Sequence, residues 1–340
     1  MRIRFSMWLK ALKTMPRISR QEWDGLDIVS RWLVATRSAA LIMSLLSAVI
    51  GGLLAFRDAP VKIWMWVLAA VGLVMAHGTN NLLNDLVDYR RGVDRGNYFR
   101  DQYGPQTLET GFLTTRRLLA YAGVTFLVAA GCGTALAIAS GWFTWVLIGA
   151  GAFFLFFYTW PLKYIALGEV SLLAVWGPLM IGGTYFVLTG YWSWMAVLAG
   201  LPYALGVSAT LVGKHLDKLD MDREKRITTL PVLLGSAGAR ATVICMIALQ
   251  YLILISLMAA RYFSPVMLLP FVSLVFFFKT VLPMFRRPRP SEKPESYPAD
   301  AWPLWYVAST FVFTRGFGMW YILGLVADTV LQLLRVWPPR

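Results

Sequence analysis

Two groups of acidic and amide side chains stand out, because each follows a long apolar stretch of the sequence. The first runs from His77 to Asp94 and the second from Lys214 to Glu224. Asn80, Asn84 and Asp88 follow one another at intervals of four residues, so a helix would place them on one face. Carboxylate and amide oxygens suit Mg²⁺, which typically takes substrate phosphates as further ligands. The spacing therefore predicts a metal site that binds a diphosphate.

The second group repeats this chemistry later in the chain. Asp217 and Asp220 are three residues apart, as are Asp85 and Asp88. Two facing carboxylate clusters would repel each other unless a cation lay between them. The alternative interpretation pairs these acids with basic neighbours in solvated loops, namely Arg90, Arg91, Arg223 and Lys225. The duplication, and the position of each cluster at the end of an apolar stretch, favour the metal site.

The composition indicates which elements must position these clusters. Of the 340 residues, 58% are hydrophobic and 15% are charged, whereas soluble globular proteins are about 45–50% apolar and about 25% charged. These values exclude a disordered chain, a coiled coil and a disulfide scaffold, and they argue against a soluble enzyme. The two cysteines lie inside apolar stretches and show no disulfide or zinc spacing. The sequence therefore predicts a polytopic membrane protein.

Nine apolar stretches reach the roughly 20 residues that a membrane-crossing helix needs. They are residues 33–56, 61–83, 116–139, 142–160, 170–190, 193–213, 239–260, 263–285 and 303–334. The alternation typical of strands is absent, so the fold class is all-α, with nine transmembrane helices. We expect a basic amphipathic N-terminal segment over 1–30 and a single transmembrane domain over 31–340, with the two clusters at 80–94 and 215–224.

The net charge of +14 follows this topology. Lys and Arg concentrate in the N-terminal segment and in the loops after the second, sixth and eighth stretches. The positive-inside rule then places the N-terminus and both acidic clusters on the cytoplasmic side. Basic proteins often bind nucleic acid, but here the charge is explained by orientation in a lipid bilayer, so nucleic acid is not an expected partner.

Four stretches carry a resemblance to a known family. They are Thr36-Arg37-Ser38, Asn84-Asp85-x-x-Asp88-Tyr89-x-x-Gly92-x-Asp94, the stretch from Tyr158 to Gly177-Pro178, and Asp222-Arg223-Glu224 with Thr229-Leu230. These motifs resemble the UbiA superfamily of intramembrane prenyltransferases, most closely its menaquinone-forming branch. The resemblance implies a helical bundle around a central cavity. It also implies Mg²⁺-dependent transfer of a prenyl group from a polyprenyl diphosphate to an aromatic, quinone-precursor-like or other lipid-soluble acceptor.

The motifs and the resemblance together give the candidate site residues. Those expected to be catalytic are Asn84, Asp88, Asp217, Asp222, Lys163 and Tyr164. Those expected to bind metal are Asn84, Asp85, Asp88, Asp94, Asp217, Asp220 and Asp222. Those expected to bind substrate are Arg37, Asn80, Asn81, Tyr158, Lys214, His215, Lys218 and Arg223.

The second cluster departs from the pattern that it resembles. Lys218 stands where the menaquinone-forming branch has an aspartate, and His215 stands where the family usually has Asn or Asp. Asp217 and Asp220 could supply the missing carboxylates one turn away, or Lys218 could contact the diphosphate directly. His215 is either a metal ligand or general base that titrates near neutral pH, or a plain hydrogen-bonding residue at a helix end.

The chemistry follows from the charges. Cations around the diphosphate would favour ionisation of the allylic C–O bond. An aromatic run between Phe153 and Trp160 offers ring faces to the resulting cation, although we expect only one or two of these rings at the cavity. The same motifs allow a membrane terpene cyclase that quenches the cation internally. An ion-coupled transporter is less favoured, because transporter sites usually lie at mid-membrane on broken helices.

Overall fold

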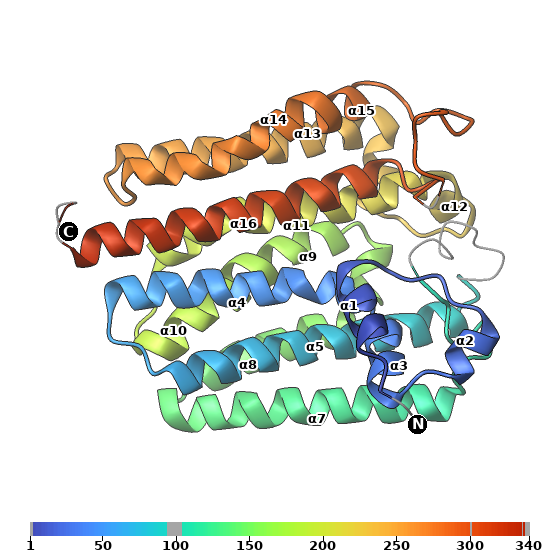
Figure 1. Ribbon diagram of the computed structural model, residues 1–340, viewed down its shortest axis with the longest axis horizontal. Helices are drawn as coiled ribbons and strands as arrows, with labels where there is room; N and C mark the ends of the chain where they lie inside the picture. Colours follow the sequence, from blue (N-terminus) through green and yellow to red (C-terminus); the bar gives the residue numbers. More distant parts are fainter. Residues whose placement is uncertain (1–2, 94–103, 300, 335, 337–340) are drawn as a thin grey trace.

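The computed structural model describes residues 3–93, 104–299, 301–334 and 336. Over these residues the chain is helical, and its long helices run side by side in one bundle (Figure 1). The predicted all-α class is therefore confirmed. Short helices connect or cover the bundle, namely α1 (Phe5–Lys13), α2 (Arg20–Asp24), α3 (Ile28–Ala35), η1 (Leu162–Tyr164) and α12 (Leu219–Glu224).

Within the described residues, eight helical segments are long and apolar enough to cross a membrane. They are α4 (Ser38–Asp58), α5 (Ile63–Arg90), α7 (Thr115–Ser140), α9 to α10 (Gly168–Thr189), α11 (Trp194–Asp217), α13 (Leu230–Ala259), η3 to α15 (Pro265–Arg286) and α16 (Tyr306–Leu333). The predicted span 142–160 forms α8 (Phe143–Phe157), whose 15 residues are fewer than the roughly 20 of a typical crossing, so the ninth predicted crossing is not confirmed. Pro161 explains the early end, because residues before proline avoid helical geometry and proline donates no backbone hydrogen bond.

Two of the crossings are assembled from shorter pieces. The first joins α9 (Gly168–Ala174), η2 (Val175–Gly182) and α10 (Gly183–Thr189). Pro178 inside η2 has no N–H for an α-helical bond, and the helix there widens to π geometry. The second joins η3 (Pro265–Ser273), α14 (Leu274–Phe276), η4 (Phe277–Val281) and α15 (Leu282–Arg286).

Three boundaries differ from the sequence prediction in ways that matter for the site. α5 continues to Arg90, so the first polar cluster up to Asp88 lies on the helix itself. Residues 33–35 belong to α3, and Arg37, with a φ of 55°, turns the chain into α4. The predicted stretch 303–334 forms α16, which begins at Tyr306 and runs without a break through Arg315.

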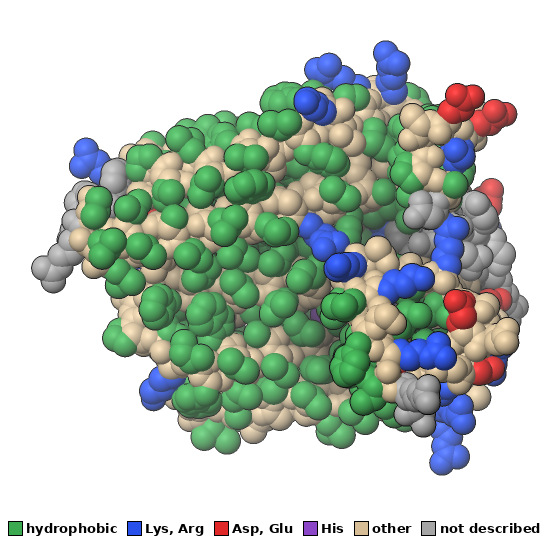
Figure 2. All heavy atoms as spheres, in the orientation of Figure 1, with side chains coloured by type: hydrophobic (Ala, Val, Ile, Leu, Met, Phe, Trp, Pro, Cys, Tyr) green, Lys and Arg blue, Asp and Glu red, His purple; other side chains and the backbone are tan. Residues whose placement is uncertain are grey.

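Charged and apolar side chains separate along the bundle. Figure 2 shows hydrophobic side chains over most of the visible face, while Lys, Arg, Asp and Glu gather mainly at the end that carries α1, α2, α3 and α12. Large apolar side chains are exposed along the long helices, for example Leu127 on α7, Phe278 on η4 and Leu323 on α16. Exposure of this kind is typical of a surface that faces lipid tails.

The end of α11 packs closely on the start of α16. An added Cβ at Gly213 would lie 2.9 Å from Thr310 Oγ1 and 3.2 Å from the carbonyl oxygen of Tyr306. Only glycine allows this approach without a shift of one helix. Gly213 immediately precedes Lys214, so the contact fixes the position of the second polar cluster.

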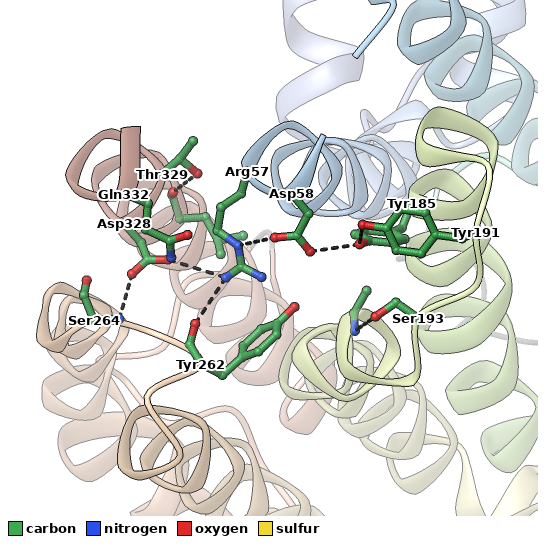
Figure 3. A network of polar contacts seen from close by, with 12 residues as sticks. Arg57, Asp58, Tyr185, Tyr191, Ser193, Tyr262, Ser264, Asp328, Thr329 and Gln332 are labelled. Carbon is green, nitrogen blue, oxygen red and sulfur yellow. Dashed lines mark hydrogen bonds and ion pairs between the residues drawn. The ribbon is translucent and has the colours of Figure 1, made fainter. Parts of the chain in front are cut away.

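Figure 3 shows a polar network at the far end of α4, away from both polar clusters. The Arg57 side chain, 1% exposed, donates to Asp58 Oδ1 at 3.0 Å and lies 3.5 Å from Asp328 Oδ2. Its guanidinium carbon lies 4.3 Å from the ring centre of Tyr262. The Tyr185 hydroxyl donates to Asp58 Oδ2 at 2.8 Å. The network therefore ties α4 to α10, to α16 and to the turn after α13.

Asp27 holds the N-terminal helices together. Its carboxylate accepts hydrogen bonds from Arg4 N at 3.0 Å, from Trp8 Nε1 at 3.2 Å and from Ser30 N at 2.9 Å. Burial raises the pKa of Asp27, but the hydrogen bonds, those from Ser30 first among them, outweigh this and hold the pKa well below its usual range. Asp27 thus both caps α3 and anchors α1.

We expect the docking of α1 to weaken in acid. Because the pKa of Asp27 is lower in the folded chain, its contribution to stability is present above the unfolded pKa of about 3.9 and is lost progressively as the pH falls below it. Hydrogen–deuterium exchange should show lower protection factors for Phe5–Lys13 at about pH 3 than at about pH 6. Asp27→Asn should remove most of that difference. Equal protection at both pH values in the unmodified chain would contradict the prediction.

Candidate active site

A cavity of about 460 Å³ lies inside the bundle, walled by α4, α5, α7, α8, the α9 to α10 crossing, α11 and α16. Part of its wall is polar and the rest is mostly apolar. Ten of the predicted site residues line it, namely Arg37, Asn80, Asn81, Asn84, Asp88, Tyr158, Lys163, Lys214, His215 and Lys218. The two clusters, distant in sequence, therefore share one cavity.

The first cluster presents one face of α5 to the cavity. The amide nitrogen of Asn80 donates to the carbonyl oxygen of Leu155 at 2.9 Å, and that of Asn84 donates to Thr159 Oγ1 at 3.1 Å. Both partners belong to α8 or to the turn that follows it. These bonds fix the orientation of the two amides.

Asp88 and Lys163 form a buried ion pair in the cavity wall. Lys163 Nζ lies 2.8 Å from Asp88 Oδ1 and 2.9 Å from Oδ2, and both side chains are buried. Lys163 comes from η1, just after α8. Burial lowers the pKa of Lys163, but the charge and hydrogen bonds of Asp88 outweigh it and raise that pKa above its ordinary value. Lys163 is therefore a protonated, fixed cation.

Arg37 reaches the cavity from the turn between α3 and α4. Its Nη2 donates to Asp85 Oδ1 at 2.6 Å and to the carbonyl oxygen of Asn81 at 3.0 Å. Asn81 in turn donates from its amide to the carbonyl oxygen of Thr36 at 2.8 Å. Asp85 does not line the cavity. Its position fits an anchor for the Arg37 guanidinium rather than a ligand that faces the cavity.

The second cluster contributes the last turns of α11. Lys214, His215 and Lys218 line the cavity. Lys218 Nζ lies 3.4 Å from Asp222 Oδ1, and both side chains are buried. Asp222 Oδ2 is also buried and has no hydrogen-bond partner among the described residues. Lys218 therefore lines the cavity, and Asp222 contacts it from outside the lining.

Asp217 lies away from the cavity. Its carboxylate accepts hydrogen bonds from Tyr306 N and Val307 N, each at 3.0 Å, and so caps the start of α16. The predicted catalytic and metal roles of Asp217 do not agree with this geometry. The physical reason is that Asp217 lies on the side of α11 that packs on the start of α16, where its carboxylate accepts from two backbone N–H groups, and that α11 ends before Asp220.

Asp220 and Arg223 also lie outside the cavity. Their side chains are 84% and 59% exposed and form an ion pair at 3.7 Å on α12. Such an exposed pair contributes little to stability. Neither the metal role of Asp220 nor the substrate contact of Arg223 is supported by this position.

Two further candidates do not join the cavity wall. The Tyr164 ring is not part of the lining and lies under the Arg91 guanidinium, whose carbon is 5.0 Å from the ring centre. Asp94, a predicted metal ligand, lies outside the described residues.

Glu169 is a site residue that the sequence reasoning did not select. Its Oε1 lies 2.6 Å from His215 Nδ1 and accepts from Leu230 N at 3.1 Å. Glu169 is fully buried near the start of an apolar crossing. An acid in such a segment is a sequence signal for function in its own right. Both interpretations of His215 agree with this pairing, because a histidine that binds a metal or acts as a general base also bonds a carboxylate through its other ring nitrogen.

The aromatic run divides between cavity and surface. Phe154 and Tyr158 line the cavity. The other four rings of the run are exposed, namely Phe153, Phe156, Phe157 and Trp160. The expectation that one or two of these rings face the cavity is confirmed. Trp176 and His77 add two more rings to the wall, with centres 5.5 Å apart.

Comparison with known proteins agrees with the family that the sequence motifs resemble. The model of the UbiA prenyltransferase family matches residues 44–302. The chain is 28% identical over 255 residues to UbiA prenyltransferase domain-containing protein 1 of Danio rerio, and the match covers 72% of this chain and 74% of the relative.

Solved structures share the fold. The apo structure of a UbiA homolog from Aeropyrum pernix matches with a TM-score of 0.64 at 20% identity, covering 85% of this chain and 98% of the other. A UbiA homolog from Archaeoglobus fulgidus, solved with GPP and Mg²⁺, matches with a TM-score of 0.61 at 14% identity, covering 87% and 99%.

Proposed function

The chain belongs to the UbiA prenyltransferase family and is an integral membrane prenyltransferase, and from this premise we propose its reaction. The enzyme transfers a prenyl group from a polyprenyl diphosphate to a lipid-soluble acceptor within the membrane. The allylic C–O bond of the donor breaks, and diphosphate leaves with the bonding electrons. A nucleophilic atom of the acceptor then forms the new bond to the allylic carbon, and the acceptor releases a proton.

One observation carries this proposal. A single cavity combines a cationic wall, formed by Arg37, Lys163, Lys214 and Lys218, with an apolar wall that includes Leu136. A prenyl diphosphate has the same two halves, a charged head and an apolar tail. The solved homolog from Archaeoglobus fulgidus binds GPP, a donor of this class.

The cationic wall acts on the leaving group. Negative charge on the diphosphate grows as the allylic bond ionises, and fixed cations in a low-dielectric cavity stabilise that charge without reorganisation. Lys163 is held by Asp88, and Arg37 by Asp85. Both cations are therefore oriented before the substrate arrives, as charge-assisted hydrogen bonds to phosphate require.

The donor set fits Mg²⁺, the ion bound by the Archaeoglobus homolog. Asn84 and Asp88 present oxygen donors to the cavity. We propose that these two residues hold the ion, with diphosphate and water as its other ligands. When bound, Mg²⁺ neutralises charge on the departing diphosphate.

The apolar wall protects the allylic cation. Water would quench that cation, and the part of the lining that includes Leu68, Leu73 and Leu147 is mostly apolar. The ring faces of Phe154, Tyr158 and Trp176 offer electrostatic attraction to a cation. We propose an aromatic quinone precursor as the acceptor class, because such a ring is apolar enough to share this space.

The polar end of the cavity is proposed to face the cytoplasm. Basic residues gather at the end of the bundle where α5 and α11 terminate (Figure 2). Cytoplasmic loops of membrane proteins carry an excess of Lys and Arg. A soluble diphosphate product could then leave directly into the cytoplasm.

The test is an assay of diphosphate release by the purified full chain in detergent. Geranyl, farnesyl and geranylgeranyl diphosphates are each supplied with and without hydroxynaphthoate or hydroxybenzoate acceptors, in Mg²⁺ or in EDTA. Release that requires an acceptor, together with a prenylated product, is the expected result. The matched controls are Asp88→Asn, which should be inactive, and Asp24→Asn on the exposed surface of α2, which should be fully active.

Two results would contradict the proposal. Release without any acceptor, accompanied by a cyclic hydrocarbon product, would assign the chain to the terpene cyclases. No release from any of the donors under any condition would remove the assignment of a prenyl diphosphate as substrate.

A further inference from the structure

The last turn of α11 and the residue that follows it bring two cations, rather than two acids, to the cavity. Lys214 and Lys218 are four residues apart, one helical turn, and both line the cavity. On the facing wall, Asp88 is the single acidic residue in the described lining, and it is already paired with Lys163. The wall formed by α11 is therefore positively charged.

The acids near these lysines have other partners. Asp217 caps α16, and Asp220 is exposed on α12. Asp222 remains, and the Lys218 ammonium lies 3.4 Å from its Oδ1. Among the described residues, no three His, Cys, Asp or Glu side chains are grouped closely enough to hold a metal ion. The second cluster thus offers one carboxylate, and an ammonium already contacts it.

We propose that Lys214 and Lys218 bind the diphosphate directly and take the place of a second divalent cation. This inference rests on the proposed function, because it concerns the diphosphate end of the same substrate. Two ammonium groups carry the same total charge as one divalent ion. Each presents three N–H donors on a flexible stem, so both can reach phosphate oxygens.

The contacts of Asp222 support the proposal that lysines replace a divalent cation at the second cluster. A divalent ion at the second cluster would have Asp222 as its carboxylate ligand, and Lys218 already contacts one oxygen of that carboxylate. The contact holds the ammonium in place, and the Lys218 side chain lines the cavity. Asp88 acts on Lys163 in the same way at 2.8 Å. The diphosphate would then contact a lysine on each of two sides of the cavity, Lys163 paired with Asp88 and Lys218 paired with Asp222.

This arrangement has a measurable consequence, because diphosphate should bind without any metal. The probe is inorganic pyrophosphate, titrated calorimetrically into the full chain in lipid nanodiscs with EDTA or with Mg²⁺. In EDTA the unmodified chain should keep a Kd within about tenfold of its value in Mg²⁺. Lys214→Gln and Lys218→Gln should each weaken binding in EDTA by about tenfold to a hundredfold. Lys293→Gln, on the exposed loop after α15, is the matched control and should bind normally.

Charge-conserving and charge-reversing variants sharpen the test. Lys218→Arg should retain metal-free binding, which separates loss of charge from loss of folding. Lys218→Asp places a carboxylate one turn from Asp222, so its pyrophosphate binding should become dependent on Mg²⁺. Thermal unfolding of each variant confirms that it is folded.

The outcomes distinguish this inference from the proposed function. If the unmodified chain transfers prenyl groups but binds no pyrophosphate in EDTA, or if both glutamine variants bind normally, the lysine proposal is overturned and the reaction stands. If the chain neither binds pyrophosphate nor turns over any prenyl diphosphate in either buffer, both proposals are overturned.

Discussion

Replacing Lys163 by methionine is expected to lower kcat for prenyl transfer by about 10²–10³-fold, the usual effect of removing one preorganised donor at a site of developing charge. Lys163 is buried, protonated and held by both oxygens of Asp88. No other described residue donates a hydrogen bond to that carboxylate. Asp88→Asn should cause a loss of similar size, because it frees Lys163 from its orienting partner and removes a proposed Mg²⁺ ligand.

The two side chains should act as one unit. Lys163→Met leaves a buried carboxylate without its cation, and breaking a buried pair costs about 3–5 kcal/mol of stability. Removing both charges, in Asp88→Asn with Lys163→Met, should restore most of that stability and none of the activity. Single-turnover kinetics and thermal unfolding in detergent measure the two effects separately.

A variant on the exposed surface serves as the control for effects of purification and of lysine substitution in general. Lys293→Gln should retain both activity and stability, since the Lys293 side chain is exposed and its ammonium donates to the carbonyl oxygens of Pro294 and Tyr297 in its own loop. If the double variant is as active as the unmodified chain, the ion pair has no part in the reaction. If it stays as unstable as Lys163→Met alone, the loss does not come from the unpaired charge of Asp88.

A similarly large effect on stability is expected at the opposite end of the bundle. Arg57→Met should lower the free energy of unfolding by about 3–5 kcal/mol, because it leaves the buried carboxylate of Asp328 without a cation. Asp328 is fully buried and also accepts from Ser264 N at 2.7 Å and from Gln332 Nε2 at 3.0 Å (Figure 3). Those neutral donors remain, but they do not replace the charge.

Two further variants test the cause of this loss. Arg57→Lys should be intermediate, because an ammonium cannot reach Asp58, Asp328 and the Tyr262 carbonyl with the planar fork of a guanidinium. Arg57→Met with Asp328→Asn should recover part of the stability, since the unpaired charge is then absent. Denaturation in mixed micelles, followed by circular dichroism, gives the free energies.

Activity gives an independent check on the location of this effect. α4 has 21 residues, so its two ends lie about 30 Å apart. Arg57 is at one end and the cavity-lining Arg37 is just before the other. The folded fraction of Arg57→Met should therefore keep its kcat. A loss of kcat at unchanged stability would show that the network acts on the site instead of on the fold.

The sequence alone determined those features that depend on local pattern. Of the nine crossings predicted from apolar stretches, eight correspond to helical segments of sufficient length among the described residues, because burial of such stretches depends mainly on composition. The spacing of Asn80, Asn84 and Asp88 predicted a shared face, because all three lie within one helix. The family resemblance follows from the same short motifs, and the family match agrees with it.

Features that depend on a helix end were not predictable in this way. The spacing of Asp217 and Asp220 was read as helical, yet α11 ends between them and sends one carboxylate to α16 and the other to solvent. The stretch 142–160 was read as a full crossing, yet α8 ends at Phe157. In both places a single break in the backbone redirects every later side chain.

The partners of the buried charges were decided by the tertiary structure. Asp88 lies 75 residues from Lys163, and Glu169 lies 46 residues from His215. Arg57 meets Asp328 through the packing of α4 on α16. From the sequence we expect each buried charge to have a partner, because burying an unpaired charge in an apolar interior costs too much free energy. Which residue fills that role depends on which helices lie side by side, and only the packing of the bundle fixes that choice.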